Sequence, residues 1–271
     1  MKEFKVVTYE IYSKKLKGED VCFAFLSDFH GICYSDGTKA LVNAIHEAHP
    51  DAVLIGGDMY VGDHPDTMQE GFSLVKKLSQ QYPVFYTYGN HEYKLHLRPE
   101  DNTAEQYEKD LKECGVQFLH NSEAVFDIKG TVFQCCGLEL PSCHYRKAFA
   151  KPAKVEDLQK LLPKPRTDAF QILLAHNPRY GDTYLKYGAD LILSGHYHGG
   201  VIRLNEKTGI VSPMYEILPR YCCGMFSRQN RHMIVSAGIG EHSVKLRIHN
   251  PRDFVVVRIK SGQKHALQMK E

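Results

Sequence analysis

LILSGHYHGG (residues 191–200) places two histidines directly after an apolar run that is typical of a buried β-strand. Four other apolar runs are also followed at once by polar side chains. The five runs and their polar residues are FAFLS with Asp28 and His30, VLIGG with Asp58, VFYTYG with Asn90 and His91, QILLA with His176, and LILSG with His196 and His198. Because ligands bind outside the carboxyl ends of strands in open α/β sheets, these residues can converge on one crevice.

The residue types in this set restrict the chemistry. Carboxylate, imidazole and amide groups without a thiolate favour Mn²⁺, Fe or Zn²⁺. These candidate ligands are too many for one ion that must keep a position open for substrate. They are Asp28, His30, Asp58, Asn90, His176, His196 and His198. They fit two ions that share a bridging carboxylate, an arrangement suited to phosphoryl transfer. In an extended segment, His196 and His198 would both face the crevice, and Tyr197 would face away.

Strand-like and helix-like patterns alternate along the chain, which predicts an α/β fold with a mainly buried, largely parallel sheet. The predicted strands are 21–27, 52–57, 84–89, 170–175 and 189–195, with several short strands over 116–138 and further runs at 233–238 and 253–259. The predicted helices are 38–48, 67–81, 103–114 and 179–187. The later strand-rich segments indicate a second sheet packed against the first.

Length and composition favour a single domain over residues 1–271, with 43% hydrophobic residues. Residues 141–169, rich in proline and lysine, and residues 203–231, rich in arginine and aromatic residues, are predicted surface insertions beside the site. The net charge of +2 is too small to require a nucleic-acid or membrane partner. The absence of a signal-like or spanning apolar stretch predicts no integral membrane segment and a cytoplasmic location.

The motifs occur in a family-specific order. Asp28-Phe29-His30, Gly57-Asp58, Gly89-Asn90-His91-Glu92, the lone His176 and Gly195-His196-Tyr197-His198 together resemble the calcineurin-like metallophosphoesterases. The tail 236–259 resembles their bacterial phosphodiesterase-like subgroup, which is related to UDP-2,3-diacylglucosamine pyrophosphatase-like enzymes. The resemblance implies a four-layer α-β-β-α sandwich of two mixed sheets flanked by helices. It also implies two divalent metal ions, foremost Mn²⁺, and hydrolysis by attack of metal-bound hydroxide.

The same resemblance implies roles for individual residues. One ion would be held by Asp28, His30, Asp58 and His198, and the other by Asp58, Asn90, His176 and His196. His91 would contact the scissile phosphate and assist the leaving group, and Glu92 would orient an imidazole. Arg247 and His242 lie in a loop that runs near the metals in the subgroup, where they would bind substrate. For Arg247, a surface salt bridge is an equal alternative.

The substrate class is suggested by a departure from one branch of the family. Protein phosphatases of the superfamily usually carry an arginine after their Gly-Asp motif, whereas GGDMYVGDHPD (56–66) has none. We therefore expect a small-molecule phosphodiester or an activated phosphomonoester as substrate. The alternatives are a peripheral enzyme that acts on lipid head groups or nucleotide-lipid diphosphates, and a non-catalytic scaffold with the same fold. The sequence leaves the oligomeric state open.

Overall fold

The apolar runs form strands that are buried on both faces. The structure is a computed structural model that describes residues 4–98, 100–147, 149–241 and 246–262. Every residue is buried in five strands: β2 (Val21–Leu26), β3 (Ala52–Ile55), β4 (Val84–Tyr86), β8 (Phe170–Ala175) and β9 (Leu191–Ser194). Such continuous apolar strands are those of sheets covered on both sides.

These strands belong to two mixed sheets of six strands each. The first sheet has the order β1-β12-β2-β3-β4-β5 and is parallel except where β12 meets β2. Its other strands are β1 (Lys5–Ser13), β5 (Val116–Phe118) and β12 (Asp253–Ser261). The second sheet has the order β10-β11-β9-β8-β7-β6, with antiparallel pairs only at its two edges. Its other strands are β6 (Glu123–Ile128), β7 (Thr131–Leu138), β10 (Gly224–Arg228) and β11 (Arg231–Val235).

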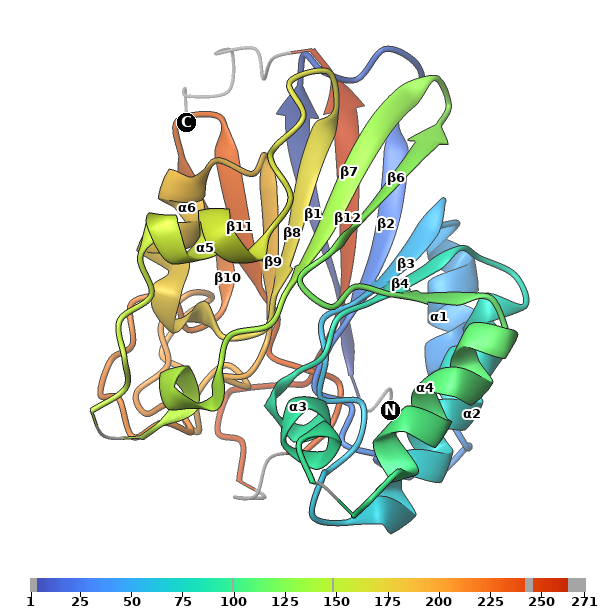
Figure 1. Ribbon diagram of the computed structural model, residues 1–271, viewed down its shortest axis with the longest axis vertical. Coiled ribbons are helices and arrows are strands. Elements are labelled where there is room, and N and C mark those ends of the chain that lie inside the picture. The colour runs from blue at the N-terminus through green and yellow to red at the C-terminus, as the bar shows by residue number, and fades with distance from the viewer. Residues whose placement is uncertain (1–3, 99, 148, 242–245, 263–271) are drawn as a thin grey trace.

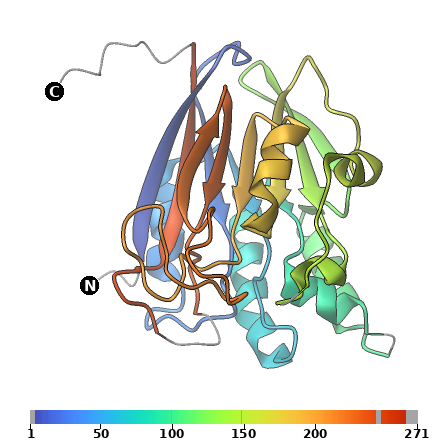
Figure 2. The same cartoon turned by 90° about the vertical axis from the view of Figure 1, so that its left-hand side faces the viewer.

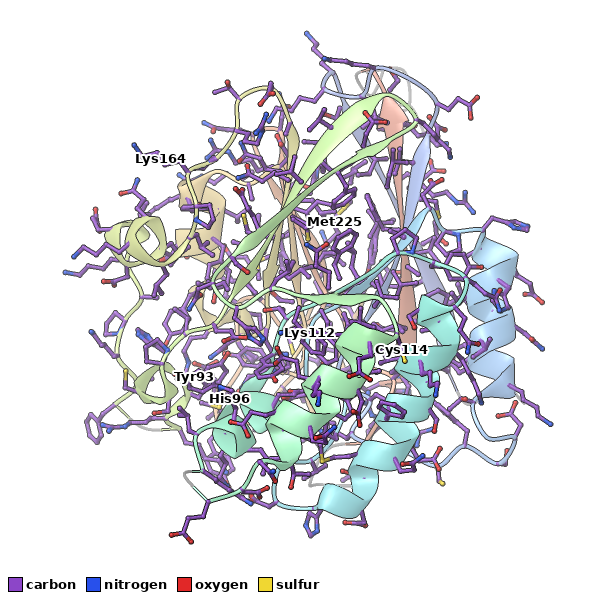
Figure 3. The ribbon with its side chains drawn as sticks, turned by 45° about the vertical axis from the view of Figure 1, so that its right-hand side comes forward. Tyr93, His96, Lys112, Cys114, Lys164 and Met225 are labelled. Carbon is purple, nitrogen blue, oxygen red and sulfur yellow. The ribbon has the colours of Figure 1, made fainter. Side chains whose placement is uncertain are left out.

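Helices cover the outer face of each sheet, so that the molecule has four layers (Figure 1). On the first sheet lie α1 (Lys39–Ala48), α2 (Met68–Ser79) and α4 (Thr103–Glu113), and on the second lie α5 (Val155–Leu161) and α6 (Gly181–Tyr187). Alternate residues of β2 pack into two different hydrophobic cores. Phe23 and Phe25 point between the sheets, while Ala24 and Leu26 point to the helices. The packed layer between the sheets, which includes Met225, is visible in Figure 3. The α-β-β-α sandwich is thus confirmed.

Several elements of the structure were not predicted. Strand β1 was missed because it is an edge strand in which exposed and half-buried residues alternate and only Ile11 is buried. The 141–169 insertion contains α5, whose Leu158 is buried in the core, and the 203–231 insertion contains most of the β10–β11 hairpin. The short helix α3 (Asn90–His96) was also missed. In the part of the chain described, no helix is long and apolar enough to span a membrane.

Candidate metal centre

The loops that follow five strands bring the predicted ligands to one end of the molecule. Asp28 and His30 follow β2, Asp58 follows β3, and His176 follows β8 directly. Asn90 is the first residue of α3, just beyond β4, and the two remaining histidines follow β9. Because β2, β3 and β4 are neighbours in one sheet and β8 and β9 in the other, both sheets contribute to the same crevice.

Three groups of side chains place potential ligand atoms within 4.8 Å of one another. The groups are Asp28 with His30 and His198, His30 with Asp58 and His91, and Asp58 with His176 and His196. His30 and Asp58 each belong to two groups, so the three form one continuous cluster. The facing Nε2 atoms of His30 and His198 lie 3.1 Å apart, and His198 Nε2 is 3.4 Å from Asp28 Oδ1.

His176 is held in a defined orientation inside this cluster. Its Nδ1 lies 2.7 Å from the Gly56 carbonyl oxygen, which can only accept a hydrogen bond. The Nδ1 atom therefore carries a proton, and Nε2 faces Asp58 Oδ2 at 3.1 Å. A backbone carbonyl that fixes the tautomer in this way is a usual companion of histidines that bind metals.

The electrostatics of the cluster reflect buried carboxylates beside imidazoles. Burial raises the pKa of Asp28 to about 6, against the effect of His176. Burial also opposes ionisation of Asp58, but the imidazoles of His176 and His91 lower its pKa well below the ordinary value. For His176, burial acts to lower the pKa, and the Asp58 and Asp28 carboxylates raise it to about 10. Positive charge is therefore favoured at the centre of the cluster.

The backbone at the site is unusual, since five of the seven predicted ligands have a positive φ. The angles are 53° at Asp28, 51° at His30, 55° at Asp58, 67° at His196 and 48° at His198. Residues other than glycine rarely adopt this conformation, and such strain is concentrated at functional sites. The segment after β9 is not extended, because the strand ends at Ser194 and the chain turns at both histidines, but both imidazoles still reach the cluster. Tyr197 is buried, and its hydroxyl group hydrogen bonds to Glu216.

Glycines allow the loops to pack closely around the two carboxylates. A Cβ atom on Gly195 would lie 2.2 Å from Asp28 Oδ2, and one on Gly89 would lie 2.1 Å from Asp58 Oδ1. The Asp28 carboxylate accepts hydrogen bonds from the backbone N–H of His196 and from the Ser27 hydroxyl group. The position of Asp28 is therefore set by both the β2 and the β9 loop.

The family resemblance implied that Glu92 orients an imidazole, but in the structure its carboxylate binds backbone N–H groups instead. Glu92 is fully buried and accepts hydrogen bonds from the backbone N–H groups of Asp58, Met59 and Gly89, at 2.7 to 3.0 Å. The Tyr86 hydroxyl group donates a fourth hydrogen bond. Burial, together with the Asp58 charge, raises the pKa of Glu92 to about 8. The side chain thus connects the Asp58 loop to the start of α3.

His91 lies next to the cluster and at the edge of a cavity. Its Nδ1 accepts a hydrogen bond from the Gly62 backbone N–H at 3.2 Å. In the neutral ring, the proton is consequently on Nε2, which makes that atom a hydrogen-bond donor. His91 also belongs to the group with His30 and Asp58, so its ring lies within reach of anything bound there.

Arg247 is mostly buried, and its Nε lies 4.0 Å from the Glu241 carboxylate, so the side chain takes part in an ion pair. Its guanidinium group donates to the carbonyl oxygens of Ala237 and Gly240 and lies 3.2 Å from His198 Nδ1. It therefore joins the loop after β11 to the loop that carries His198. His242, the other predicted substrate residue, lies outside the described residues.

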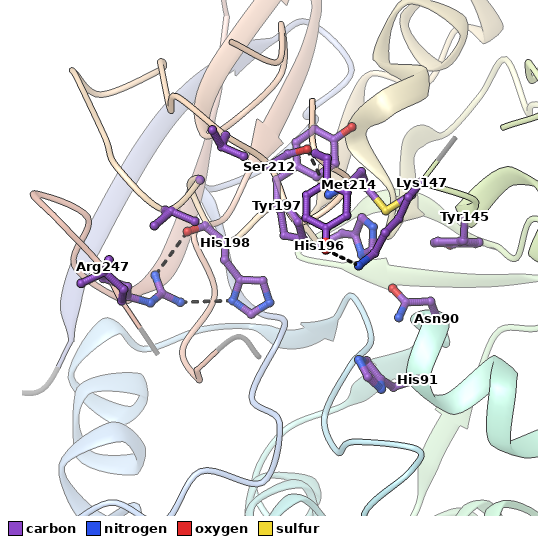
Figure 4. A pocket seen from close by; sticks show the side chains of 16 residues that line it. Asn90, His91, Tyr145, Lys147, His196, Tyr197, His198, Ser212, Met214 and Arg247 are labelled. Atoms are coloured by element: carbon purple, nitrogen blue, oxygen red, sulfur yellow. Dashed lines mark hydrogen bonds between the residues drawn. The ribbon is translucent and has the colours of Figure 1, made fainter. Parts of the chain in front are cut away.

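A cavity of about 330 Å³ opens beside the cluster (Figure 4). Asn90, His91, His196 and His198 form one wall, and Val201, Val211, Pro213, Met214 and Leu246 contribute an apolar wall. Both predicted insertions reach the cavity, through Tyr145 and Lys147 from one and Tyr215 from the other. The Tyr145 ring packs edge-on against the His196 ring, with 5.5 Å between the ring centroids. Sequence reasoning missed these residues, because no local motif distinguishes them.

Comparisons with known proteins agree with this arrangement. Residues 23–200 match the family described as calcineurin-like phosphoesterase. The uncharacterized metallophosphoesterase YkuE of Bacillus subtilis is 27% identical over 242 residues, which cover 88% of this chain and 77% of YkuE. The phosphodiesterase YaeI of Escherichia coli is 26% identical over 196 residues, which cover 72% of this chain and 65% of YaeI. The chain spans a smaller share of a Campylobacter jejuni relative, 63% of its length.

The fold of this chain is similar to that of a solved structure. The sulfate thiohydrolase SoxB of Thermus thermophilus superposes with a TM-score of 0.50 at 15% sequence identity. The matched region covers 89% of this chain and 57% of that protein. The two-sheet architecture is therefore shared with a structure of very different sequence.

Proposed function

Because this chain belongs to the calcineurin-like phosphoesterase family, we propose that it is a two-metal phosphoesterase acting on a small-molecule phosphodiester or an activated phosphomonoester. The observation that carries this proposal is the continuous cluster in which Asp58 and His30 are shared between groups. A carboxylate shared between two groups of ligands is what a pair of bridged ions requires.

The residues fit two ions in the following way. Asp28, His30, Asp58 and His198 would hold one ion, and Asp58, Asn90, His176 and His196 would hold the other. The Asn90 side-chain oxygen supports the second set, because it is buried and accepts no hydrogen bond from the described residues. Nitrogen and oxygen donors without thiolate suit Mn²⁺, with Fe and Zn²⁺ as alternatives. When bound, such ions activate water and neutralise charge on phosphoryl oxygens.

The chain's own residues would supply the remaining functions. His91, with its proton on Nε2, would donate a hydrogen bond to a phosphoryl or leaving-group oxygen beside the cluster. The cavity next to it offers room for the organic part of the substrate, and its apolar wall suits the second substituent of a diester. No arginine follows Asp58 in the segment 59–64, which argues against a protein phosphatase.

The proposal is tested by metal removal and by single substitutions. We expect a chelator to abolish hydrolysis of bis-p-nitrophenyl phosphate and Mn²⁺ to restore it. Asp58→Asn should lower kcat/KM by more than about a hundredfold, since changes to groups that merely support a ligand cost ten- to a hundredfold. His91→Gln should lower kcat while metal content is retained. His64→Gln is the matched control, because His64 is exposed in the neighbouring loop.

Two outcomes would overturn the proposal. Full activity of Asp58→Asn would exclude a role for the shared carboxylate. A metal content below about one ion per chain after loading with Mn²⁺ would exclude a two-metal centre and favour the non-catalytic scaffold. Comparison of bis-p-nitrophenyl phosphate with p-nitrophenyl phosphate distinguishes a diesterase from a monoesterase.

A further inference from the structure

Large apolar side chains are exposed on the segments that reach the cavity. We call five of them the apolar rim, and their exposed fractions lie between 50% and 98%: Phe149, Tyr215, Ile217, Leu218 and Leu246. Single exposed apolar side chains are common on the surfaces of soluble proteins, but a group of them beside a binding cavity marks an interaction site. Phe149, at 98%, has almost no protein neighbour.

The segments that carry the rim lie together at the end of the molecule where the site opens. Lys147 Nζ lies 3.2 Å from the Tyr215 hydroxyl group and 4.3 Å from the centre of its ring. Arg179 connects the same two segments, because it donates to the Arg146 carbonyl oxygen and to the Glu216 carboxylate. Tyr215 and Leu246 line the cavity itself. Figure 2 shows both loop regions at the lower end of the molecule.

Basic side chains lie between the apolar ones. Arg146, Lys147 and Lys151 are exposed, and none of the three forms an ion pair with a carboxylate in the described part of the chain. The acidic neighbour Glu216 is already paired with Arg179. The rim therefore has an excess of positive charge next to exposed apolar groups.

This combination fits a lipid bilayer better than a protein partner. The centres of protein interfaces are depleted of charged residues, and lysine in particular is disfavoured there. In contrast, surfaces that bind membranes insert apolar side chains below the head groups while lysine and arginine attract anionic lipids. Apolar side chains at loop tips, with basic residues only a few positions away, match the second pattern.

We propose that the apolar rim docks on the surface of an anionic lipid bilayer, with the cavity mouth facing the head groups. The docking is independent of catalysis. The further step, that the cavity then receives the phosphoester of a membrane lipid, rests on the proposed function. In that geometry, the phosphate reaches the cluster beside His91 while the acyl chains remain in the bilayer.

The experiment is co-sedimentation of the full chain with vesicles of phosphatidylcholine, with or without phosphatidylglycerol. We expect binding to the anionic vesicles, and a loss of about tenfold or more in partitioning for Phe149→Ser combined with Ile217→Ser. Val125→Ser is the matched control, because Val125 is 46% exposed on β6, in the edge hairpin formed with β7. Arg146→Gln combined with Lys151→Gln should reduce binding to anionic vesicles and leave the weak binding to phosphatidylcholine unchanged.

The outcomes separate this proposal from the proposed function. Phe149 and Ile217 do not line the cavity, so the double variant should hydrolyse soluble bis-p-nitrophenyl phosphate at the wild-type rate. Absence of vesicle binding by the wild-type protein would overturn the docking proposal, whatever its activity. Equal binding of the double variant and the wild type would do the same. A wild-type dimer that becomes monomeric in the double variant would assign the rim to a second copy of this chain instead.

Discussion

The positive φ angles at the site lead to a prediction with opposite signs at two neighbouring histidines. His196 has a φ of 67°, whereas His176 does not adopt a positive φ, and both are buried in the same group around Asp58. At each of these positions, a glycine variant and an alanine variant both lack the imidazole that the wild-type histidine contributes. Glycine and alanine at these two positions therefore differ mainly in what they do to the backbone.

The magnitude follows from two opposing terms. An L-residue in the left-handed region costs about 1–2 kcal/mol, and glycine avoids this cost. Glycine also loses more conformational entropy on folding than alanine, which costs about 0.4–1 kcal/mol. At His196 we expect the glycine variant to be more stable than the alanine variant by up to about 1.6 kcal/mol. At His176 we expect the order to reverse, with alanine more stable by about 0.5–1 kcal/mol.

Urea denaturation of the four variants in the presence of a chelator measures these differences without a contribution from bound metal. Mn²⁺ binding should be weakened equally in both variants of each pair, since the lost ligand is the same. Backbone strain at His196 would be excluded if alanine were more stable than glycine there by as much as at His176.

Two further predictions concern groups that support the site or the fold. Glu92→Gln should weaken Mn²⁺ affinity about ten- to a hundredfold, because an amide nitrogen cannot accept the N–H groups that fix the Asp58 loop; an unchanged affinity in calorimetric titration would contradict this role. Burial alone would lower the pKa of His120, but hydrogen bonds to the Glu108 and Glu139 carboxylates raise it to about 9. Its stabilising effect is therefore complete below about pH 6.5 and is lost as the pH rises through 9. Because the side chain is 34% exposed, we expect a decrease of about 1–2 kcal/mol in the free energy of unfolding over that range, absent in His120→Gln.

The sequence predicted the strands that carry the site because burial on both faces leaves a clear signal. The runs at β2, β3, β8 and β9 are apolar at nearly every position, and their ends coincide with the polar residues of the crevice. Strand β1 lacks that signal, since it lies at a sheet edge and alternates exposed and half-buried residues. Its position is determined by pairing with β12, nearly 250 residues later in the chain.

The approach of the two insertions could not be predicted from local patterns. Lys147 and Tyr215 meet across a separation of 68 residues, and neither belongs to a periodic or motif-bearing segment. Arg179, in the turn Pro178–Tyr180 that precedes α6, also joins the two segments through the Arg146 carbonyl oxygen and the Glu216 carboxylate. Residues that line the cavity from these two segments therefore escape prediction, whereas residues that determine the fold do not.

The strained backbone and the charge balance of the cluster have a common consequence for metal binding. The ligand positions are set by main-chain turns and by contacts such as that between Asp28 and the His196 N–H, so little rearrangement is needed when a cation enters. Before it enters, a protonated His176 compensates the buried carboxylates of Asp28 and Asp58. A divalent ion must displace that proton, because a metal-binding imidazole is neutral. We therefore expect the affinity for metal to rise with pH until His176 has lost its Nε2 proton, while Nδ1 keeps the proton that it donates to the Gly56 carbonyl oxygen.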